Sequence, residues 1–345
     1  MLDEVRHPAK DDRSIVALGM VDNIDITPDG VTVTLAFGKR RDPLSEYLIG
    51  AARAALVRGC KGMRTEVKTV VKDDVKPSPK KGLELNQDQL AGIKHIIGIA
   101  SGKGGVGKST VSVNLAVALA RAGYKVGLAD ADVYGPSIPT MTGTQGFQPE
   151  AIRSDDGQEL MVPVEKFGVK WMSVGYFAGE DQALIWRGPM ACNALKQMIL
   201  QVAWGDLDFL LIDMPPGTGD IHISLVQDIP MEAAIVVTTP QKVALSDVRK
   251  GVSMLRNENV NRRILGIVEN MAWFTPEEHP DEKYYIFGKN GGAEMAAGFG
   301  LPLLAQIPLV QSLREGGDNG EPAALSNRPD SVAFLDLAAK IIETI

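Results

Sequence analysis

GKGGVGKST, at residues 102–110, matches the pattern G-x-x-x-x-G-K-[S/T], in which a lysine and a hydroxyl residue follow the second glycine. An apolar run at residues 96–100 precedes it and predicts a short buried strand. Residues 111–122 follow it and predict a helix that ends at Gly123. A strand, a glycine loop and a helix in this order are the context that the pattern requires, so it indicates a phosphate-binding loop rather than a turn without a ligand.

This loop has the chemistry to hold a nucleoside triphosphate. Glycines let successive backbone N–H groups point at phosphate oxygens, and the N-terminus of the next helix adds a partial positive charge. In such a loop Lys108 reaches the β- and γ-phosphates, and the Ser109 hydroxyl binds Mg²⁺. The sequence therefore predicts ATP and Mg²⁺ as cofactors. The residues expected to contact the nucleotide are Gly102, Lys103, Gly104, Gly105, Val106, Gly107, Lys108, Ser109 and Thr110.

Carboxylates follow two other expected strands. An apolar run ends in Asp213, and a buried strand that delivers one carboxylate to Mg²⁺ is the Walker B arrangement, so Ser109 and Asp213 are the expected magnesium ligands. Asp130 ends the strand expected at residues 126–130, and Asp132 follows two residues later. A carboxylate near the γ-phosphate can orient or deprotonate the attacking water. Capping of the next turn is the alternative role for these two aspartates.

Lys103 lies inside the loop, where an ordinary phosphate loop carries no particular residue. KGGVGKST resembles the deviant Walker A motif of the family that includes MinD, ParA, arsenical-pump ATPases, nitrogenase iron protein and the Mrp/NBP35 proteins. The resemblance implies that Lys103 crosses a dimer interface to phosphates bound by the other subunit, and so implies a homodimer. From its spacing alone, Lys103 would equally be a solvated surface lysine.

Three further motifs share this resemblance. DADVYGPS at residues 130–137 resembles switch I of the family, which implies Asp132 as the water-activating residue and Asp130 as its support. DMPPGTGD at residues 213–220 is close to switch II of the Mrp group. Asn270 matches the asparagine that contacts adenine, although standing alone it would be a turn residue. The resemblance thus implies three catalytic residues, namely Lys103, Lys108 and Asp132.

From residue 93 onward, apolar runs alternate with helical stretches. This alternation predicts an α/β fold with a mostly parallel, doubly wound P-loop NTPase sheet and helices on both faces. Strands are expected at residues 96–100, 126–130, 170–174, 209–213, 234–238, 264–269 and 303–307, and helices at 108–122, 189–203, 243–257 and 332–344. The ATPase domain is expected to span residues 93–345.

A smaller α/β domain is expected at residues 1–73. Its pattern predicts strands at residues 14–25, 31–37 and 63–71, a turn at 28–30 and a helix at 43–58. This domain resembles the MIP18-like domain, but residues 39–43 lack the cysteine that usually stands beside a proline there. Prolines, a glycine and charges without apolar periodicity predict a linker at residues 74–92.

The net charge and the apolar runs of the chain indicate where the protein is located and which partners it does not bind. The net charge of −7 gives no general attraction to nucleic acid or anionic membranes, and neither is expected as a partner. The N-terminus is too polar for a secretory signal, and no apolar run approaches the length of about 18 residues that suggests a membrane span. Both features predict a cytoplasmic protein.

The Mrp/NBP35 resemblance also implies an iron–sulfur cluster. Many members hold a bridging [4Fe–4S] cluster with a C-x-x-C pair from each subunit, shortly after the Glu-Asn-Met segment. Here the following residues read AWFTPEEHP, without cysteine. Two ligand sets are open: Cys192 with one other ligand per subunit, or His279 with Glu277 or Glu278. Equally open is that Cys192 is buried on a helix and His279 is a surface residue, so the cluster ligands are unassigned.

The sequence thus predicts a slow, Mg²⁺-dependent, homodimeric ATPase that carries or assembles iron–sulfur clusters. Its expected partners are apo iron–sulfur client proteins or assembly factors. One alternative is a nucleotide-gated adaptor without a cluster of its own. Another is a positioning ATPase like MinD or ParA. The expected C-terminal helix disfavours the latter, because its polar face sets Asp336 and Glu343 against Lys340 alone and should not seek anionic lipid.

Overall fold

The chain divides into two compact units, Met1–Glu84 and Leu85–Ile345. In the computed structural model, the described residues are 1–8, 13–27, 30–37, 44–60, 62–71, 87–133, 135–154, 157–177, 188–258, 260–276, 278–279 and 281–345. Most of the predicted linker, residues 74–86, lies outside them. The domain boundaries drawn at residues 73 and 92 therefore stay predictions, and each unit is described by itself.

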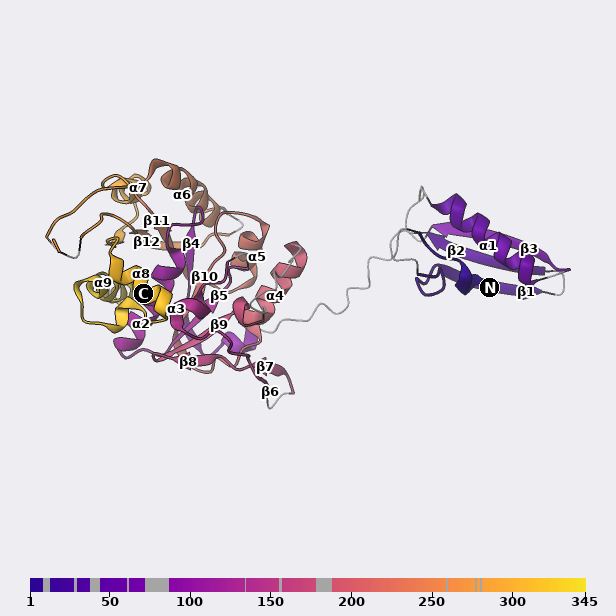
Figure 1. The fold of residues 1–345 in the computed structure, drawn as a ribbon, viewed down its shortest axis with the longest axis horizontal. Helices are drawn as coiled ribbons and strands as arrows, with labels where there is room; N and C mark the ends of the chain where they lie inside the picture. The colour runs from indigo at the N-terminus through magenta and orange to yellow at the C-terminus, as the bar shows by residue number, and fades with distance from the viewer. Residues whose placement is uncertain are drawn as a thin grey trace. The chain divides into compact units, whose positions relative to one another are not determined.

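The first unit is a three-stranded sheet in the order β1-β2-β3 with one helix against it (Figure 1). Alternate residues of β2, from Val31 to Phe37, are buried against Leu48 and Ala52 of the helix, which is the predicted half-buried strand. The bounds are η1 Leu2–Glu4, β1 Val21–Thr27, β2 Gly30–Phe37, α1 Ser45–Gly59 and β3 Arg64–Val71.

The predicted start of one strand in this unit is wrong. The strand expected at residues 14–25 begins only at Val21, and residues 15–19 form turns instead. Ser14 explains the difference, because its hydroxyl accepts the Ala17 N–H at 3.0 Å and so gives the backbone an alternative to strand pairing. Pro28 and Asp29 of the turn expected at residues 28–30, and the helix start expected at Pro43, lie outside the described residues.

The second unit contains an eight-stranded sheet in the order β13-β12-β11-β4-β10-β5-β9-β8. β8 pairs antiparallel with β9, whereas the other neighbours are parallel, so the predicted mostly parallel sheet is confirmed. Its strands are β4 Ile93–Ser101, β5 Val126–Asp130, β8 Val164–Lys166, β9 Val169–Ser173, β10 Leu207–Asp213, β11 Ala233–Thr238, β12 Arg263–Glu269 and β13 Leu303–Gln306. A separate hairpin pairs β6 Ala151–Arg153 with β7 Glu159–Met161.

All four predicted helices are present, with ends within three residues of the prediction. They are α2 Lys108–Arg121, α4 Gly188–Leu200, α6 Lys242–Leu255 and α9 Pro329–Thr344. Four shorter helices were missed, namely α3 Ile138–Thr142, α5 Asp220–Asp228, α7 Gly291–Phe299 and α8 Gln311–Asn319. Short 3₁₀ turns are η2 Gln87–Leu90, η3 Val174–Phe177 and η4 Ala323–Leu325.

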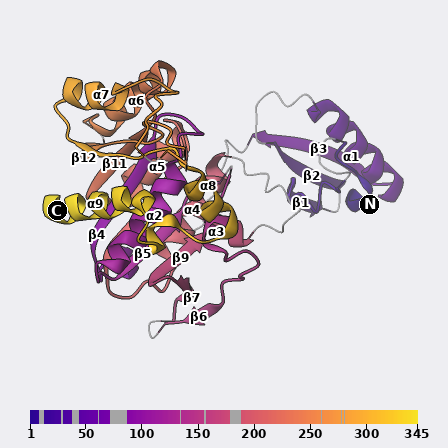
Figure 2. The ribbon, with the colours of Figure 1, turned by 60° about the vertical axis from the view of Figure 1, so that its left-hand side comes forward.

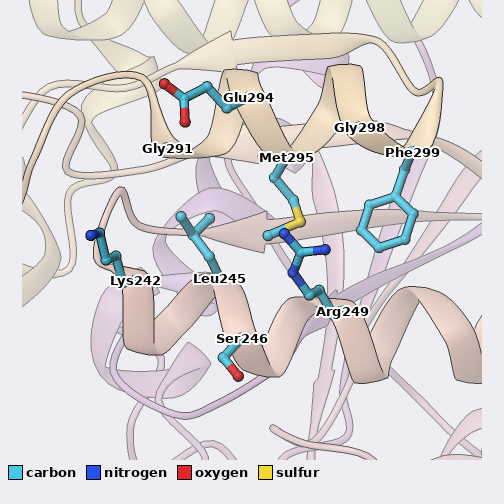
Figure 3. A pocket seen from close by; sticks show the side chains of 9 residues that line it. All are labelled: Lys242, Leu245, Ser246, Arg249, Gly291, Glu294, Met295, Gly298 and Phe299. Atoms are coloured by element: carbon cyan, nitrogen blue, oxygen red, sulfur yellow. The ribbon is translucent and has the colours of Figure 1, made fainter.

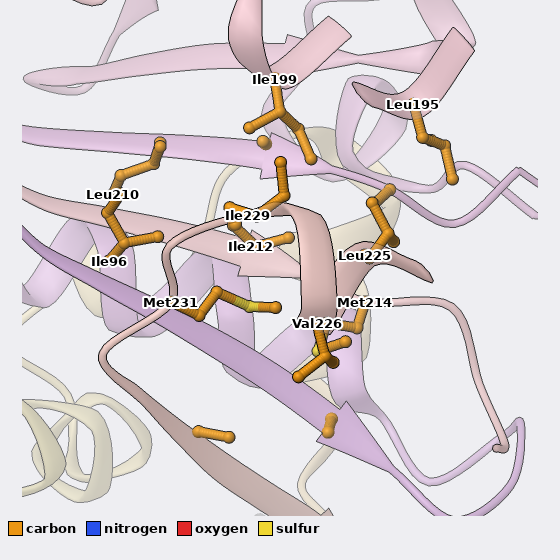
Figure 4. Packing of buried hydrophobic residues seen from close by; sticks show 14 of the residues in the cluster. Ile96, Leu195, Ile199, Leu210, Ile212, Met214, Leu225, Val226, Ile229 and Met231 are labelled. Carbon is orange, nitrogen blue, oxygen red and sulfur yellow. The ribbon is translucent and has the colours of Figure 1, made fainter. Parts of the chain in front are cut away.

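Helices cover both faces of the sheet (Figures 1 and 2). Leu210 and Ile212 of β10 pack in the cluster that contains Leu195 and Ile199 of α4 and Leu225 of α5 (Figure 4). The intervening residues of β10 belong to the other cluster, with α2 and α9. Because both faces are buried, the strands read as continuous apolar runs. Burial of each such side chain contributes about 1.5–3 kcal/mol, which holds the carboxyl ends of the strands rigidly in place.

Candidate active site

The phosphate loop is the connection between β4 and α2. Gly105 and Gly107 adopt φ angles of +79° and +77°, in the left-handed region that favours glycine. At Gly107 a Cβ atom would also lie 2.2 Å from Nδ2 of Asn270, so a side chain has no room there. The two glycines therefore set a loop conformation that leads directly into the N-terminus of α2 at Lys108.

Strand order brings the expected carboxylates to this loop. β10 lies between β4 and β5, and Asp213 pairs in register with Ile99 on one side and Asp130 on the other. Both carboxylates are fully buried. The carboxyl ends of neighbouring parallel strands meet at one edge of a sheet, so residues more than 80 positions apart in the sequence become neighbours.

Lys108 and Ser109 converge on Asp213. The Lys108 ammonium lies 2.8 Å from Oδ2 of Asp213, and the Ser109 hydroxyl donates to the same oxygen at 2.6 Å. A hydroxyl and a carboxylate that meet in a buried place offer the hard oxygen ligands that Mg²⁺ prefers. The pair predicted to bind magnesium is thus assembled with donors that fit this ion.

Ser112 holds the other oxygen of the same carboxylate. Its hydroxyl lies 2.6 Å from Oδ1 of Asp213, and both residues are fully buried. Sequence reasoning missed this residue. A signal for it was present, because Ser112 follows Ser109 by three positions and so lies on the same side of the helix.

Replacing Ser112 with alanine should weaken the affinity of the nucleotide-bound protein for Mg²⁺. With Mg²⁺ and ATP bound, Lys108 would contact phosphates and Ser109 the metal, leaving the Ser112 hydrogen bond to orient Asp213. We expect the Mg²⁺ concentration at half-saturation to rise about 10–100-fold, measured with a fluorescent ATP analogue. Ser112→Thr keeps the hydroxyl and should restore most of the affinity. An unchanged Mg²⁺ midpoint in Ser112→Ala would contradict this role.

Asp130 is a buried acid behind the site. It accepts hydrogen bonds from the Ser173 hydroxyl at 2.9 Å and from the Asp132 N–H at 3.2 Å. Burial, together with the nearby charge of Asp213, raises the pKa of Asp130 to about 7. The carboxyl therefore holds a proton for part of the time at neutral pH, and its contacts brace the residues around Asp132.

Asp132 and Lys103 lie nearer the surface than Lys108. The Asp132 carboxylate is 14% exposed and lies 3.8 Å from the Lys108 ammonium. Lys103 is partly exposed, and its carbonyl accepts a hydrogen bond from the Ser101 hydroxyl at 3.0 Å. The structure thus brings Asp132 together with Lys108, and leaves Lys103 partly exposed.

The segment after Asp213 is tied to the same strand as the phosphate loop. Met214 and Gly217 donate backbone hydrogen bonds to the carbonyls of Ile99 and Ser101, each at 3.0 Å. His222 follows in α5, and burial lowers its pKa to about 4, so the ring is neutral at pH 7. Only 2% of this histidine is exposed.

Asn270 contacts the loop as well. Its Nδ2 donates to the carbonyl of Val106 at 2.9 Å, and only 3% of the residue is exposed. The residue therefore braces the phosphate loop. An adenine contact through its other amide atom, Oδ1, stays a prediction.

The candidate cluster ligands come from two segments of the chain, α4 and residues 277–279. Cys192 is half-buried on α4, His279 is exposed with Nδ1 3.9 Å from Glu282, and Glu278 is exposed. Glu277 lies outside the described residues. Within the part of the chain that the structure describes, no three His, Cys, Asp or Glu side chains gather to hold a metal ion. The described helices also include none long and apolar enough to span a membrane.

Comparison with protein families gives two matches that together cover most of the chain. A family model described as ParA, NUBPL iron-transfer P-loop NTPase, matches residues 92–343. A second, described as iron–sulfur cluster assembly protein, matches residues 1–69.

Individual relatives agree with these models. An iron–sulfur cluster carrier protein of Synechocystis sp. is 43% identical over 328 residues, which are 95% of this chain and 90% of that protein. A nucleotide-binding protein from Archaeoglobus fulgidus, solved in complex with ADP, is 36% identical with a TM-score of 0.60, over 72% of this chain and 94% of that one. The cell division ATPase MinD of Pyrococcus furiosus is 27% identical with a TM-score of 0.51, over 73% of this chain and 99% of its own.

Proposed function

This chain belongs to the NUBPL iron-transfer P-loop NTPase family, and we propose that it is an ATP-hydrolysing homodimer that carries iron–sulfur clusters to apo client proteins in the cytoplasm. The observation that supports the ATPase most directly is the convergence of Lys108, Ser109 and Asp213 at the ends of β4 and β10. The name of the Synechocystis relative supports the cluster-carrying role.

The proposed chemistry is attack of water on the γ-phosphorus of ATP. Ser109 and Asp213 would hold Mg²⁺, which would supply positive charge beside the phosphate oxygens. Lys108 and the N–H groups of residues 104–109 bind the phosphate oxygens and stabilise the negative charge that develops on them. Asp132 orients the water and accepts its proton as the bond between the γ-phosphorus and the bridging oxygen breaks. ADP and phosphate are the products, and turnover is slow because nucleotide here serves mainly to switch conformation.

The homodimer gives Lys103 its proposed role, a contact with the phosphates of the partner subunit. With a non-hydrolysable ATP analogue and Mg²⁺, light scattering should show a mass twice the 37.0 kDa of the chain. Lys103→Ala should weaken this dimer about 10-fold or more, since a charged hydrogen bond contributes about 1.5–3 kcal/mol. Lys125→Ala serves as the control, because this exposed lysine precedes β5, at the amino ends of the parallel strands and away from the phosphate loop. A monomeric wild type, or equal dimerisation of Lys103→Ala, would refute the role.

Anaerobic reconstitution with iron and sulfide tests the carrier role. We expect cluster absorbance and more than one iron atom per dimer, with a lower iron content in Cys192→Ser, because thiolates are the usual ligands of these clusters. Cys60→Ser is the matched control for removal of a thiol. Iron below one atom per dimer without cluster absorbance would favour a nucleotide-gated adaptor instead. The observation that supports this second candidate is the lack of a cysteine in the segment at residues 271–280.

A further inference from the structure

Helix α6 carries a row of exposed polar residues along one side. The row consists of Lys242, Ser246, Arg249 and Ser253 of α6 and of Arg256, which follows the helix directly as its C-cap. Their spacings of three or four residues place them along one side of the helix. All five are exposed. At 1.5 Å per residue, Lys242 and Arg256 stand about 21 Å apart, with Arg249 midway. We call this row the α6 ridge.

A groove follows each side of the ridge. The first, of 270 Å³, lies between α6 and α7, where Leu245 and Arg249 rise toward Met295 and Phe299 (Figure 3). The second, of 690 Å³, runs between α5 and α6, and its apolar lining comes from Ile223, Met254 and Val260. Arg249 lines both grooves.

The charge of the ridge is largely unopposed. Lys242 and Arg249 make no ion pair or hydrogen bond with any residue that the structure describes, and Glu294 is the acid that lines the first groove. Arg256 is held in place, because its guanidinium lies 5.7 Å from the centre of the Phe299 ring and donates to the Phe299 carbonyl. Three cations in a row, on a chain whose net charge is −7, mark a local site for carboxylates.

The ridge is also connected to the candidate active site. The backbone of α6 packs directly on the phosphate loop, since a Cβ atom on Gly102 would lie 2.4 Å from the carbonyl carbon of Asp247. Thr218, in the segment that follows Asp213, lines the second groove. An occupant of the grooves would therefore touch a segment expected to respond to the γ-phosphate.

We propose that the α6 ridge and its two grooves are a docking site for an acidic amphipathic helix of a partner protein. Carboxylates of that helix pair with Lys242 and Arg249, and its apolar side chains enter the grooves beside Met295 and Met254. Charge complementarity selects an acidic partner. The apolar linings of the grooves require that this partner also carries apolar side chains. The docking itself is independent of ATP hydrolysis. Its response to nucleotide rests on the proposed ATPase function.

The test uses the full chain and a fluorescein-labelled synthetic helix with glutamates two turns apart and leucines between them. Its anisotropy should report binding, and Arg249→Glu should weaken that binding about 10-fold or more, since like charges then face each other. Arg153→Glu makes the same charge change at an exposed arginine of β6 and should leave binding unchanged. Unchanged circular dichroism would show that Arg249→Glu is folded.

Three results would overturn the proposal. In the first, Arg249→Glu and wild-type protein bind the acidic helix equally well. In the second, the wild type binds a control helix with lysine in place of glutamate as tightly as the acidic helix; in the third, a DNA oligonucleotide binds more tightly and displaces the acidic helix. Hydrogen exchange with the helix bound should protect α5, α6 and α7, which line the two grooves, and protection confined to other elements would also refute the assignment. If the helix docks but wild-type protein hydrolyses no ATP, the docking site stands and the proposed function fails.

Discussion

Lys108→Ala should lower the kcat/KM for ATP hydrolysis by about 10³-fold, the cost of removing one preorganised donor from a charge-stabilising site. The Lys108 ammonium is 95% buried and is the cation that lies within 4 Å of both Asp213 and Asp132 in the described structure. Phosphate release at saturating Mg²⁺ measures the loss. Lys94→Ala removes an exposed lysine paired with Asp208 and should leave the rate unchanged.

The same variant should change how folding stability depends on pH. The folded-state pKa of Asp130, about 7, lies above its unfolded value of 3.8, so the folded protein binds more protons between these values and loses stability as pH rises through them. Lys108 opposes this shift by its charge. Without Lys108 the folded-state pKa of Asp130 should rise further, so the loss of stability should continue above pH 7. A wild-type rate, or an unchanged pH profile of the unfolding midpoint, would contradict the role of this lysine.

Asp132→Asn should lower kcat by about 10²–10⁴-fold and leave nucleotide affinity nearly unchanged. Asparagine keeps the size of the side chain and removes the negative oxygen that accepts the proton of the attacking water. Single-turnover hydrolysis and binding of a fluorescent ATP analogue separate the two effects. Asp206→Asn, at an exposed aspartate near the other end of β10, is the control. If kcat is unchanged, Asp132 serves only to cap the following turn.

Much of the second unit was predictable because its strands and long helices carry strong periodicity. All seven expected strands and all four expected helices of that unit form, since continuous apolar runs require burial on both faces. The misplaced strand at residues 14–25 shows the opposite case. There a local bond from Ala17 to the Ser14 hydroxyl competes with pairing, and apolar pattern alone does not reveal it.

The missed short helices lacked a pattern of their own. α7, with the sequence GGAEMAAGF, opens with two glycines, and α8 includes two more in nine residues, which disfavours both as isolated helices. Buried Glu269 accepts the backbone N–H of Gly292 at 2.7 Å and so satisfies the first turn of α7. Such helices form because neighbouring elements hold them.

By itself the sequence determined the loop chemistry, because glycine positions, one lysine and one hydroxyl residue are set by spacing along the chain. It also determined which aspartates end the strands. Only the tertiary structure decided that Ser112 holds Asp213, that Asn270 braces the loop at Val106, and that α6 carries cations between two grooves. These relations join residues that are distant in sequence or depend on which side of a helix faces its neighbours, and both follow from packing of the sheet and its helices.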